Sequence, residues 1–484
     1  MKSKNYFLKI ASALLLLFAF NTNANNLQIT GTSVSGSNVT FTVSWDNSWN
    51  ANVAPANWDA VWVFIKYQDC NTRLWAHAGL STLATDHTAG SPLQADPVAD
   101  GKGVFLRRSA LGGGNITSVS ITLKMSIPAG TYNYKVFGIE MVNVPQGAFD
   151  LGDGTSNATY NSISVTASSQ SGGLTSATIG GASAAVPATF PMGYNAFYAM
   201  KYEISQQQYV EFLNALTYDQ QKAHTFNDPI SAAGTYAMFT GFNYRSGIRI
   251  SVPGNNAAIP AVFVCDATAG VEDNNDDGQA TACSGMSYSD LAAYLDWSAL
   301  RPMTEMEFEK LARGTAPRLA NEYVWGTTDI NAVYNVSAGL INDFLPNETF
   351  TPATNGSCAV AIGSASGSYG PLKVGVFATG TSGRASSGAG YYGCMELGGN
   401  VADRVVTTAN TTGTAFNGTL GDGTISALGL ANQATWPLPV NAAGIGFRGG
   451  DYVNVAARVQ TSDRASVGTV DAARSYNYGG RGVR

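Results

Sequence analysis

Three glycine-rich motifs near the end of the chain constrain its fold more than any other sequence feature. They lie at residues 399–401 (GNV), 446–452 (GFRGGDY) and 479–484 (GGRGVR). Glycine reaches backbone conformations that other residues resist. We therefore interpret the glycines, arginines and aromatic residues of these motifs as a scaffold of turns, which predicts fold rather than activity.

Three helices are predicted upstream of these motifs. Residues 205–216 carry aromatic and leucine side chains at helical spacing, and a second helix begins at about residue 289. The third begins at Thr304, where Thr-Glu-Met-Glu forms a capping box, and ends at Gly314. The long stretches between and after these helices are rich in glycine and serine, which favours irregular structure.

Together with other segments, these motifs resemble the formylglycine-generating enzyme (sulfatase-modifying factor) family. The matching segments are, in chain order, 141–149 (MVNVPQGAF), 201–212 (KYEISQQQYVEF), 301–314 (RPMTEMEFEKLARG), 323–326 (YVWG), 374–377 (VGVF), 392–401 (YGCMELGGNV), 448–452 (RGGDY) and 482–484 (GVR). The resemblance covers residues 139–484 and implies a C-type-lectin-like fold with many loops. We predict an α+β protein.

Residues 25–138 lie outside this resemblance and are predicted to form strands. Apolar and polar residues alternate over 39–45, and 60–67 (AVWVFIKY) is almost continuously apolar. Glycine and proline clusters separate these runs from further short apolar runs. We predict a β-sandwich over 25–138.

The first 24 residues have the pattern of an export signal. Lys2, Lys4 and Lys9 precede an apolar run over 10–20 that is too short to span a bilayer as a helix. An uncleaved membrane anchor is the alternative. We predict a signal peptide over 1–24 and a protein that is secreted, extracellular or held at the cell surface, with no membrane span in the mature chain.

Composition narrows the kinds of partner. Charged residues make up only 12% of the chain, and its formal net charge is −6. An acidic chain without basic clusters is a poor match for nucleic acid. A neutral, polar surface suits an exported protein, and we expect an extracellular protein or a glycan as the partner of its C-terminal face.

The resemblance implies a copper site that this chain cannot build. Family catalysis needs two cysteines just after the Arg-Gly-Gly-x-aromatic element, whose thiolates bind copper(I) and oxidise a cysteine of a sulfatase to formylglycine. The first of these positions falls on Asn454, and residues 453–484 contain no cysteine. We therefore expect no copper and no catalytic residues.

The resemblance also implies a structural calcium site. Its ligands would be the side chains of Glu396 and Asp403 with the backbone carbonyls of Gly399 and Val401. Carboxylate and carbonyl oxygens are the ligands that calcium prefers. Two solvated acids on a loop are the alternative interpretation.

A second acidic loop follows part of a calcium-binding pattern. Asp273, Asn275 and Asp277 match the first half of an EF-hand loop, but Ser284 stands where the bidentate acid is needed. Cys265 and Cys283 flank the loop, and export permits disulfides. We predict a disulfide between them, with weak calcium binding as a hypothesis and a solvated acidic loop as the preferred alternative.

The C-terminal surface is the candidate binding site, because polar side chains mixed with tyrosine and arginine are typical of recognition surfaces. Its predicted members are Asp451, Tyr452, Asn454, Arg458, Asp463, Arg464, Tyr476 and Tyr478. The same fold serves as a variable ligand-binding domain in proteins of diversity-generating retroelements.

We predict a non-catalytic binding or surface-assembly protein. One alternative is a copper-dependent formylglycine-generating oxidase, or a related enzyme, with an altered site. Another is a structural extracellular component that assembles with itself.

Overall fold

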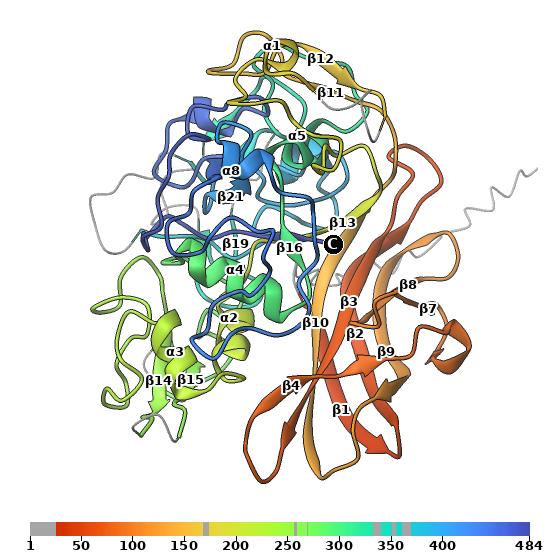
Figure 1. Cartoon of the computed structure of the whole chain (residues 1–484), viewed down its shortest axis with the longest axis vertical. Coiled ribbons are helices and arrows are strands. Elements are labelled where there is room, and N and C mark those ends of the chain that lie inside the picture. Colours follow the sequence, from red (N-terminus) through yellow and green to blue (C-terminus); the bar gives the residue numbers. More distant parts are fainter. Residues whose placement is uncertain are drawn as a thin grey trace, which may run out of the picture.

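The computed structural model describes residues 26–167, 174–255, 259–268, 270–332, 340–350, 355–360 and 369–484. The predicted signal peptide, residues 1–24, lies outside this part of the chain. Figure 1 shows two parts of unequal size. We call the strand-rich part that runs up to β10 (Tyr132–Val144) the N-terminal half, and the larger part after it, made mostly of loops and short helices, the loop-rich half. Over the described residues, no helix is both long and apolar enough to cross a membrane.

The first sheet belongs entirely to the N-terminal half, and its strands are antiparallel. Its strand order is β1-β2-β9-β5, with β6 also paired to β9. The strands are β1 (Gln28–Ser35), β2 (Asn38–Asn50), β9 (Gly112–Ser126), β5 (Gly79–Leu80) and β6 (Thr88–Ala89).

The second sheet joins the two halves of the molecule. Its order is β16-β23-β13-β10-β3-β8-β7, with β4 paired to β3. The predicted boundary between residues 138 and 139 falls inside β10, so the division of the chain there stays a prediction. The strands are β16 (Arg301–Pro302), β23 (Gly482–Val483), β13 (Phe197–Met200), β10 (Tyr132–Val144), β3 (Asp59–Asp69), β8 (Val104–Arg108), β7 (Leu93–Pro97) and β4 (Trp75–His77).

Strand β3 is buried on both faces, which explains its continuous apolar sequence. Val61, Val63 and Ile65 pack into the core between the two sheets, against alternate residues of β2. Trp62 and Phe64 point the other way, into the core of the loop-rich half. The strands predicted over 39–45 and 60–67 are confirmed, and the two antiparallel sheets share one hydrophobic core.

The three predicted helices are confirmed, at α2 (Gln206–Leu213), α4 (Tyr288–Trp297) and α5 (Glu305–Arg313). Helix α5 has the expected capping box, in which Thr304 accepts from the backbone N–H of Glu307, and Gly314 follows it at φ 64°. Helix α3 (Tyr218–His224) is not predicted, because its sequence YDQQKAH has no apolar period.

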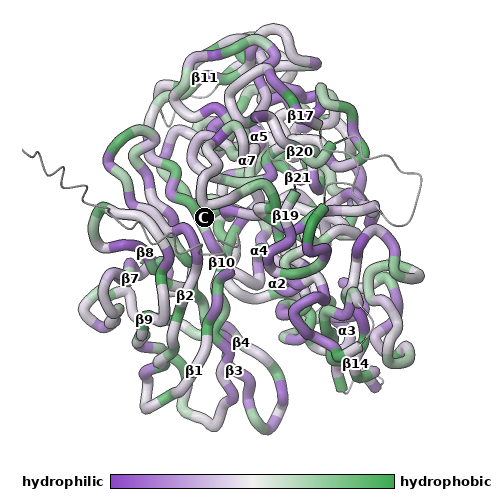
Figure 2. The backbone as a smooth tube through the Cα atoms, turned by 180° about the vertical axis from the view of Figure 1, so that it is seen from behind, coloured by the Kyte–Doolittle hydropathy of each residue, from purple (hydrophilic) through white to green (hydrophobic). Residues whose placement is uncertain are grey.

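Figure 2 shows hydrophilic and hydrophobic stretches interspersed through the loop-rich half of the chain. The remaining elements of the described chain are short. They are β11 (Phe149–Leu151), β12 (Ile163–Val165), α1 (Ser176–Ile179), β14 (Ile248–Val252), β15 (Val262–Cys265), β17 (Asn331–Ala332), β18 (Leu340–Ile341), β19 (Thr349–Phe350), β20 (Ser357–Cys358), α7 (Arg384–Ser387), β21 (Asp403–Val406), α8 (Thr411–Thr414), β22 (Ile445–Arg448) and the 3₁₀ turns η1 (Ala84–Asp86) and η2 (Ala456–Val459).

Candidate binding site at the C-terminal motifs

A cavity of about 120 Å³ opens over the Arg-Gly-Gly-Asp motif that follows β22. Strand β22 pairs with β21, which fixes the motif against the glycine-rich turn before β21. The cavity is lined by Ala402, Phe447, Arg448, Gly449, Gly450, Asp451, Asn454, Arg458, Asp463, Ser466, Thr469, Asn477 and Tyr478.

Asp451 is the most confined acid of this cavity. Its carboxylate accepts hydrogen bonds from the Val453 backbone N–H at 2.9 Å and from the side-chain amides of Asn454 and Asn477 at 2.7 Å each. Burial raises the pKa of Asp451 to about 6, while these donors oppose the rise. The carboxylate is thus held in place and changes charge in a mildly acidic range.

The rest of the lining combines a salt bridge with stacked rings. Arg458 Nη1 lies 3.3 Å from both oxygens of Asp463, and the arginine side chain is 31% exposed. The ring of Tyr478 stacks on Phe447 at a centroid distance of 4.4 Å, and Arg404 lies over both rings. The cavity therefore offers carboxylates, amides and hydroxyls beside an aromatic surface.

Five of the eight residues predicted for the binding face line this cavity: Asp451, Asn454, Arg458, Asp463 and Tyr478. The other three are placed elsewhere. Tyr452 is buried and donates its hydroxyl to the Tyr476 carbonyl, and Tyr476 stacks on Tyr244. Arg464 is also buried, because it pairs with an acid of α5.

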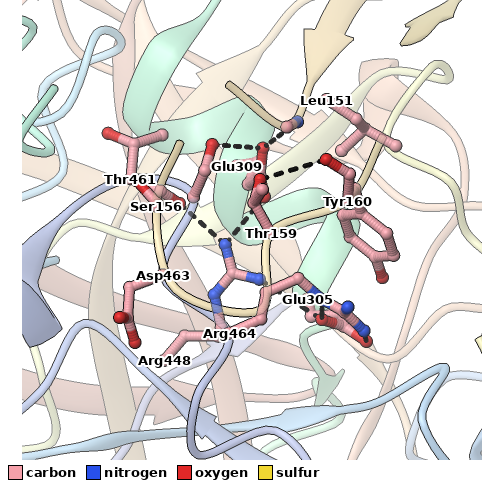
Figure 3. Close-up of polar contacts among 12 residues, drawn as sticks. Leu151, Ser156, Thr159, Tyr160, Glu305, Glu309, Arg448, Thr461, Asp463 and Arg464 are labelled. Atoms are coloured by element: carbon pink, nitrogen blue, oxygen red, sulfur yellow. Dashed lines mark hydrogen bonds and ion pairs between the residues drawn. The ribbon is translucent and has the colours of Figure 1, made fainter. Parts of the chain in front are cut away.

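Arg448, which lines the cavity, belongs to a buried network of ion pairs between α5 and the C-terminal loops (Figure 3). Glu305 accepts from Arg464 Nε at 2.7 Å and from Arg448 Nη1 at 3.2 Å. Arg448 Nη2 also donates to Glu309 at 2.9 Å, and Glu309 pairs with Arg313. All five side chains are buried, so the arginines hold the loops to the helix.

Several donors keep Glu305 charged. Burial by itself would raise its pKa, but Arg464, Arg448 and the Thr408 backbone N–H together lower the pKa to about 2. The Thr407 and Thr408 hydroxyls also donate to it, each at 3.0 Å.

Gly449 shows why the motif needs glycine. Its φ is 78°, and a Cβ atom there would lie 2.2 Å from the Leu397 carbonyl oxygen. The close contact brings the motif loop onto the turn that contains the predicted calcium ligands. The positive φ and the close contact each exclude an ordinary side chain at this position.

Asp403 and Glu396, two of the predicted calcium ligands, both make contacts within the protein. Arg481 Nε donates to both oxygens of Asp403, at 3.1 and 2.9 Å, and Arg481 Nη2 donates to the Glu396 carbonyl at 2.7 Å. One oxygen of Glu396 accepts from the Gly375 N–H at 2.7 Å. Burial raises the pKa of Glu396 to about 7, although Arg481 opposes the rise.

Arg481 neutralises Asp403, whereas Glu396 Oε2 has no hydrogen-bond partner among the described residues, and the calcium site stays a prediction. Gly399 and Val401 are buried in the same turn, where their N–H groups donate to Gly449 and Glu203. Within the described part of the chain, no group of three or more His, Cys, Asp or Glu side chains is arranged to hold a metal ion.

The acidic loop is organised by its own hydrogen bonds. Asp273 accepts from the Cys265 N–H, and Asp277, which is fully buried, accepts from Thr268 and Asn274. Asn275 is exposed. The two carboxylates therefore accept hydrogen bonds from backbone groups, and weak calcium binding here stays a hypothesis.

All five cysteines are free thiols in the structure, so the predicted Cys265–Cys283 disulfide is not formed there. Both residues are buried, and burial raises the pKa of each thiol well above its usual value. The lining of the cavity contains no cysteine and no histidine among the described residues. Asn454, on which the first family cysteine is predicted to fall, donates its side-chain amide to Asp451, and the expectation of no copper stays a prediction.

Comparison with known proteins identifies the family. The sulfatase-modifying factor enzyme 1-like domain matches residues 133–484. The chain therefore belongs to this family. No curated protein matches the sequence. Solved structures that match include Treponema denticola variable protein 1, at 12% identity and a TM-score of 0.31, over 72% of this chain and 95% of that chain.

Two groups of site residues are missed by sequence reasoning. Ser466, Thr469 and Asn477 line the cavity but have no motif of their own. Glu305 and Glu309 hold the arginines beside the cavity, and although they lie in the 301–314 motif, only helical spacing, which places them one turn apart, hints at a shared role.

Proposed function

We propose that this protein is a non-catalytic binding member of its family. The observation that carries the proposal is the lining of the C-terminal cavity, where carboxylates, amides and hydroxyls stand around a stacked tyrosine. The side chains there can form hydrogen bonds but offer no thiolate for oxidation.

The chemistry of the lining favours a ligand rich in hydroxyl groups. Asp451, Asp463 and Asn477 present acceptors and donors in directions fixed by their own hydrogen bonds. The rings of Tyr478 and Phe447 supply the aromatic part of the lining. We infer an extracellular glycan as the first candidate and a polar loop of an extracellular protein as the second.

The other expectations belong to the same proposal. The N-terminal signal would export the chain, and the N-terminal strands of the two sheets would act as a β-sandwich that supports the binding half. A structural calcium ion at Glu396 and Asp403, with the carbonyls of Gly399 and Val401, would have to share Asp403 with Arg481.

The test is binding of the mature chain to a glycan array, followed by calorimetric titration with any glycan that is retained. Asp451→Asn should lower the affinity by about tenfold or more, because a charge-assisted hydrogen bond is lost. Glu272→Gln, on an exposed loop, is the matched control. Formylglycine produced above blank from a sulfatase-derived cysteine peptide, with copper and oxygen, would contradict the proposal.

A further inference from the structure

Three charged side chains are buried together where the shared sheet passes from one half of the molecule to the other. Lys201 Nζ lies 3.1 Å from Glu140 Oε2 and 3.7 Å from Asp59 Oδ2. None of the three side chains is more than 3% exposed. Asp59 begins β3, Glu140 lies in β10, and Lys201 directly follows β13, so the three come from neighbouring strands.

Hydrogen bonds hold the carboxyl group of Asp59 in an arrangement that favours attack of a nucleophile on its carbon. Its Oδ1 accepts from the Ser48 hydroxyl and from the Trp49 backbone N–H, each at 2.8 Å. Its Oδ2 accepts from Trp45 Nε1 at 2.9 Å. Two donors on one oxygen stabilise the negative charge that develops when a nucleophile attacks the carboxyl carbon.

The charges of the cluster do not balance. Two carboxylates face one ammonium group, and Glu140 Oε1 has no hydrogen-bond partner in the described part of the chain. Burial raises the pKa of Asp59 and of Glu140, and Lys201 opposes both shifts. Burial by itself would lower the pKa of Lys201, but the opposing effects of Tyr202, Glu140 and Asp59 are together larger and raise the pKa above its usual value. The amine therefore keeps its proton until a base removes it.

We propose that Lys201 and Asp59 join in an intramolecular isopeptide bond, with Glu140 as the proton carrier. Glu140 first takes a proton from the Lys201 ammonium and passes it to Asp59 Oδ2. The neutral amine then attacks the Asp59 carboxyl carbon, and Oδ1 takes up the negative charge beside Ser48 and Trp49.

The second half of the reaction restores Glu140. It takes one proton from the attacking nitrogen and delivers it to the Oδ2 hydroxyl. The C–Oδ2 bond breaks, water leaves, and Oδ1 becomes the amide carbonyl. An ammonium and a carboxylate are thus converted into one amide and one water, with no oxidant or external reagent.

The surroundings suit this reaction. The rings of Trp49 and Tyr202 lie 5.0 and 5.4 Å from Lys201 Nζ, which keeps the amine in an apolar setting. A second cavity, of about 430 Å³, adjoins Lys201 between the two halves of the molecule and gives the released water a path out. The product would tie the start of β3 to the end of β13 across β10.

The test is the mass of the reduced mature chain. The bond lowers the intact mass by about 18 Da, the mass of one water. Trypsin should then leave residues 25–66 joined to residues 136–222, because the modified Lys201 is not cleaved. Lys201→Arg and Glu140→Gln should both restore the full sequence mass.

Lys135→Arg is the matched control, since Lys135 lies 3.7 Å from Glu211 in a partly exposed pair and should leave the mass loss unchanged. A wild-type chain of full sequence mass, cleaved by trypsin at Lys201, would overturn the proposal and leave the cluster as a buried ionic contact. This outcome does not depend on whether any variant folds.

Discussion

Glu305 offers the sharpest test of how the binding cavity is supported. It is the only carboxylate within salt-bridge distance of Arg464 among the described residues, whereas Arg448 has Glu309 as well. Glu305→Gln keeps the shape of the side chain and removes its charge. Arg464 then remains buried without a counter-charge, which typically costs about 3–5 kcal/mol.

The pKa gives an independent magnitude. A fall from an ordinary 4.5 to about 2 corresponds to about 3 kcal/mol of stability at pH 7. Because the folded pKa is the lower one, this contribution is complete above pH 4.5 and is lost as the pH falls toward 2. At pH 3, about 2 kcal/mol of it should already be gone.

Urea denaturation of both proteins between pH 7 and pH 3 measures this difference. The gap between wild type and Glu305→Gln should narrow steadily as the pH falls. Glu272→Gln, whose carboxylate is exposed, should change the free energy of unfolding by less than about 0.5 kcal/mol at every pH. A gap below 1 kcal/mol at pH 7, or one that stays constant with pH, would refute the reasoning.

Three further outcomes are expected. Carbon-13 NMR should show the Asp451 carboxyl titrating near pH 6 instead of 3.8, a transition that Asp451→Asn removes; titration near 3.8 would mean that the carboxyl is solvated. Gly449→Ala should lower the free energy of unfolding in urea by at least about 2 kcal/mol. Gly468→Ala is the control and should not lower it by this amount, because a Cβ there meets nothing within 4 Å. Equal effects of the two variants would contradict the strain argument. The fragment 133–484 should elute as an aggregate from a sizing column, because it exposes the edge of β10 that β3 covers in the full chain. A monomeric fragment that unfolds cooperatively would contradict this and show that the sheet can be divided.

The scaffold is the part of this molecule that the sequence predicts well. Thr304 and Gly314 mark the ends of α5 through local backbone chemistry, and the family motifs place the loops around it. The apolar run of β3 predicts burial, but the sequence alone does not show that its two faces enter two different cores.

The site is predicted less completely, because its geometry depends on contacts between distant segments. Arg464 and Tyr452 have the side chains of a recognition surface, yet pairing with Glu305 and packing under the Asp451 loop bury them. Asn477 reaches Asp451 from 26 residues away, a contact that no local pattern signals. In the same way, Arg481 reaches Asp403 across 78 residues, which no local pattern signals.

The continuity of β10 has a mechanical consequence. Its 13 residues extend over about 45 Å, and 11 of them are paired with β3. A pull on the N-terminal sheets passes into the rest of the molecule as shear along this ladder, where many hydrogen bonds must break together. A protein held by its N-terminal half would therefore present the C-terminal cavity at a fixed orientation, even under flow.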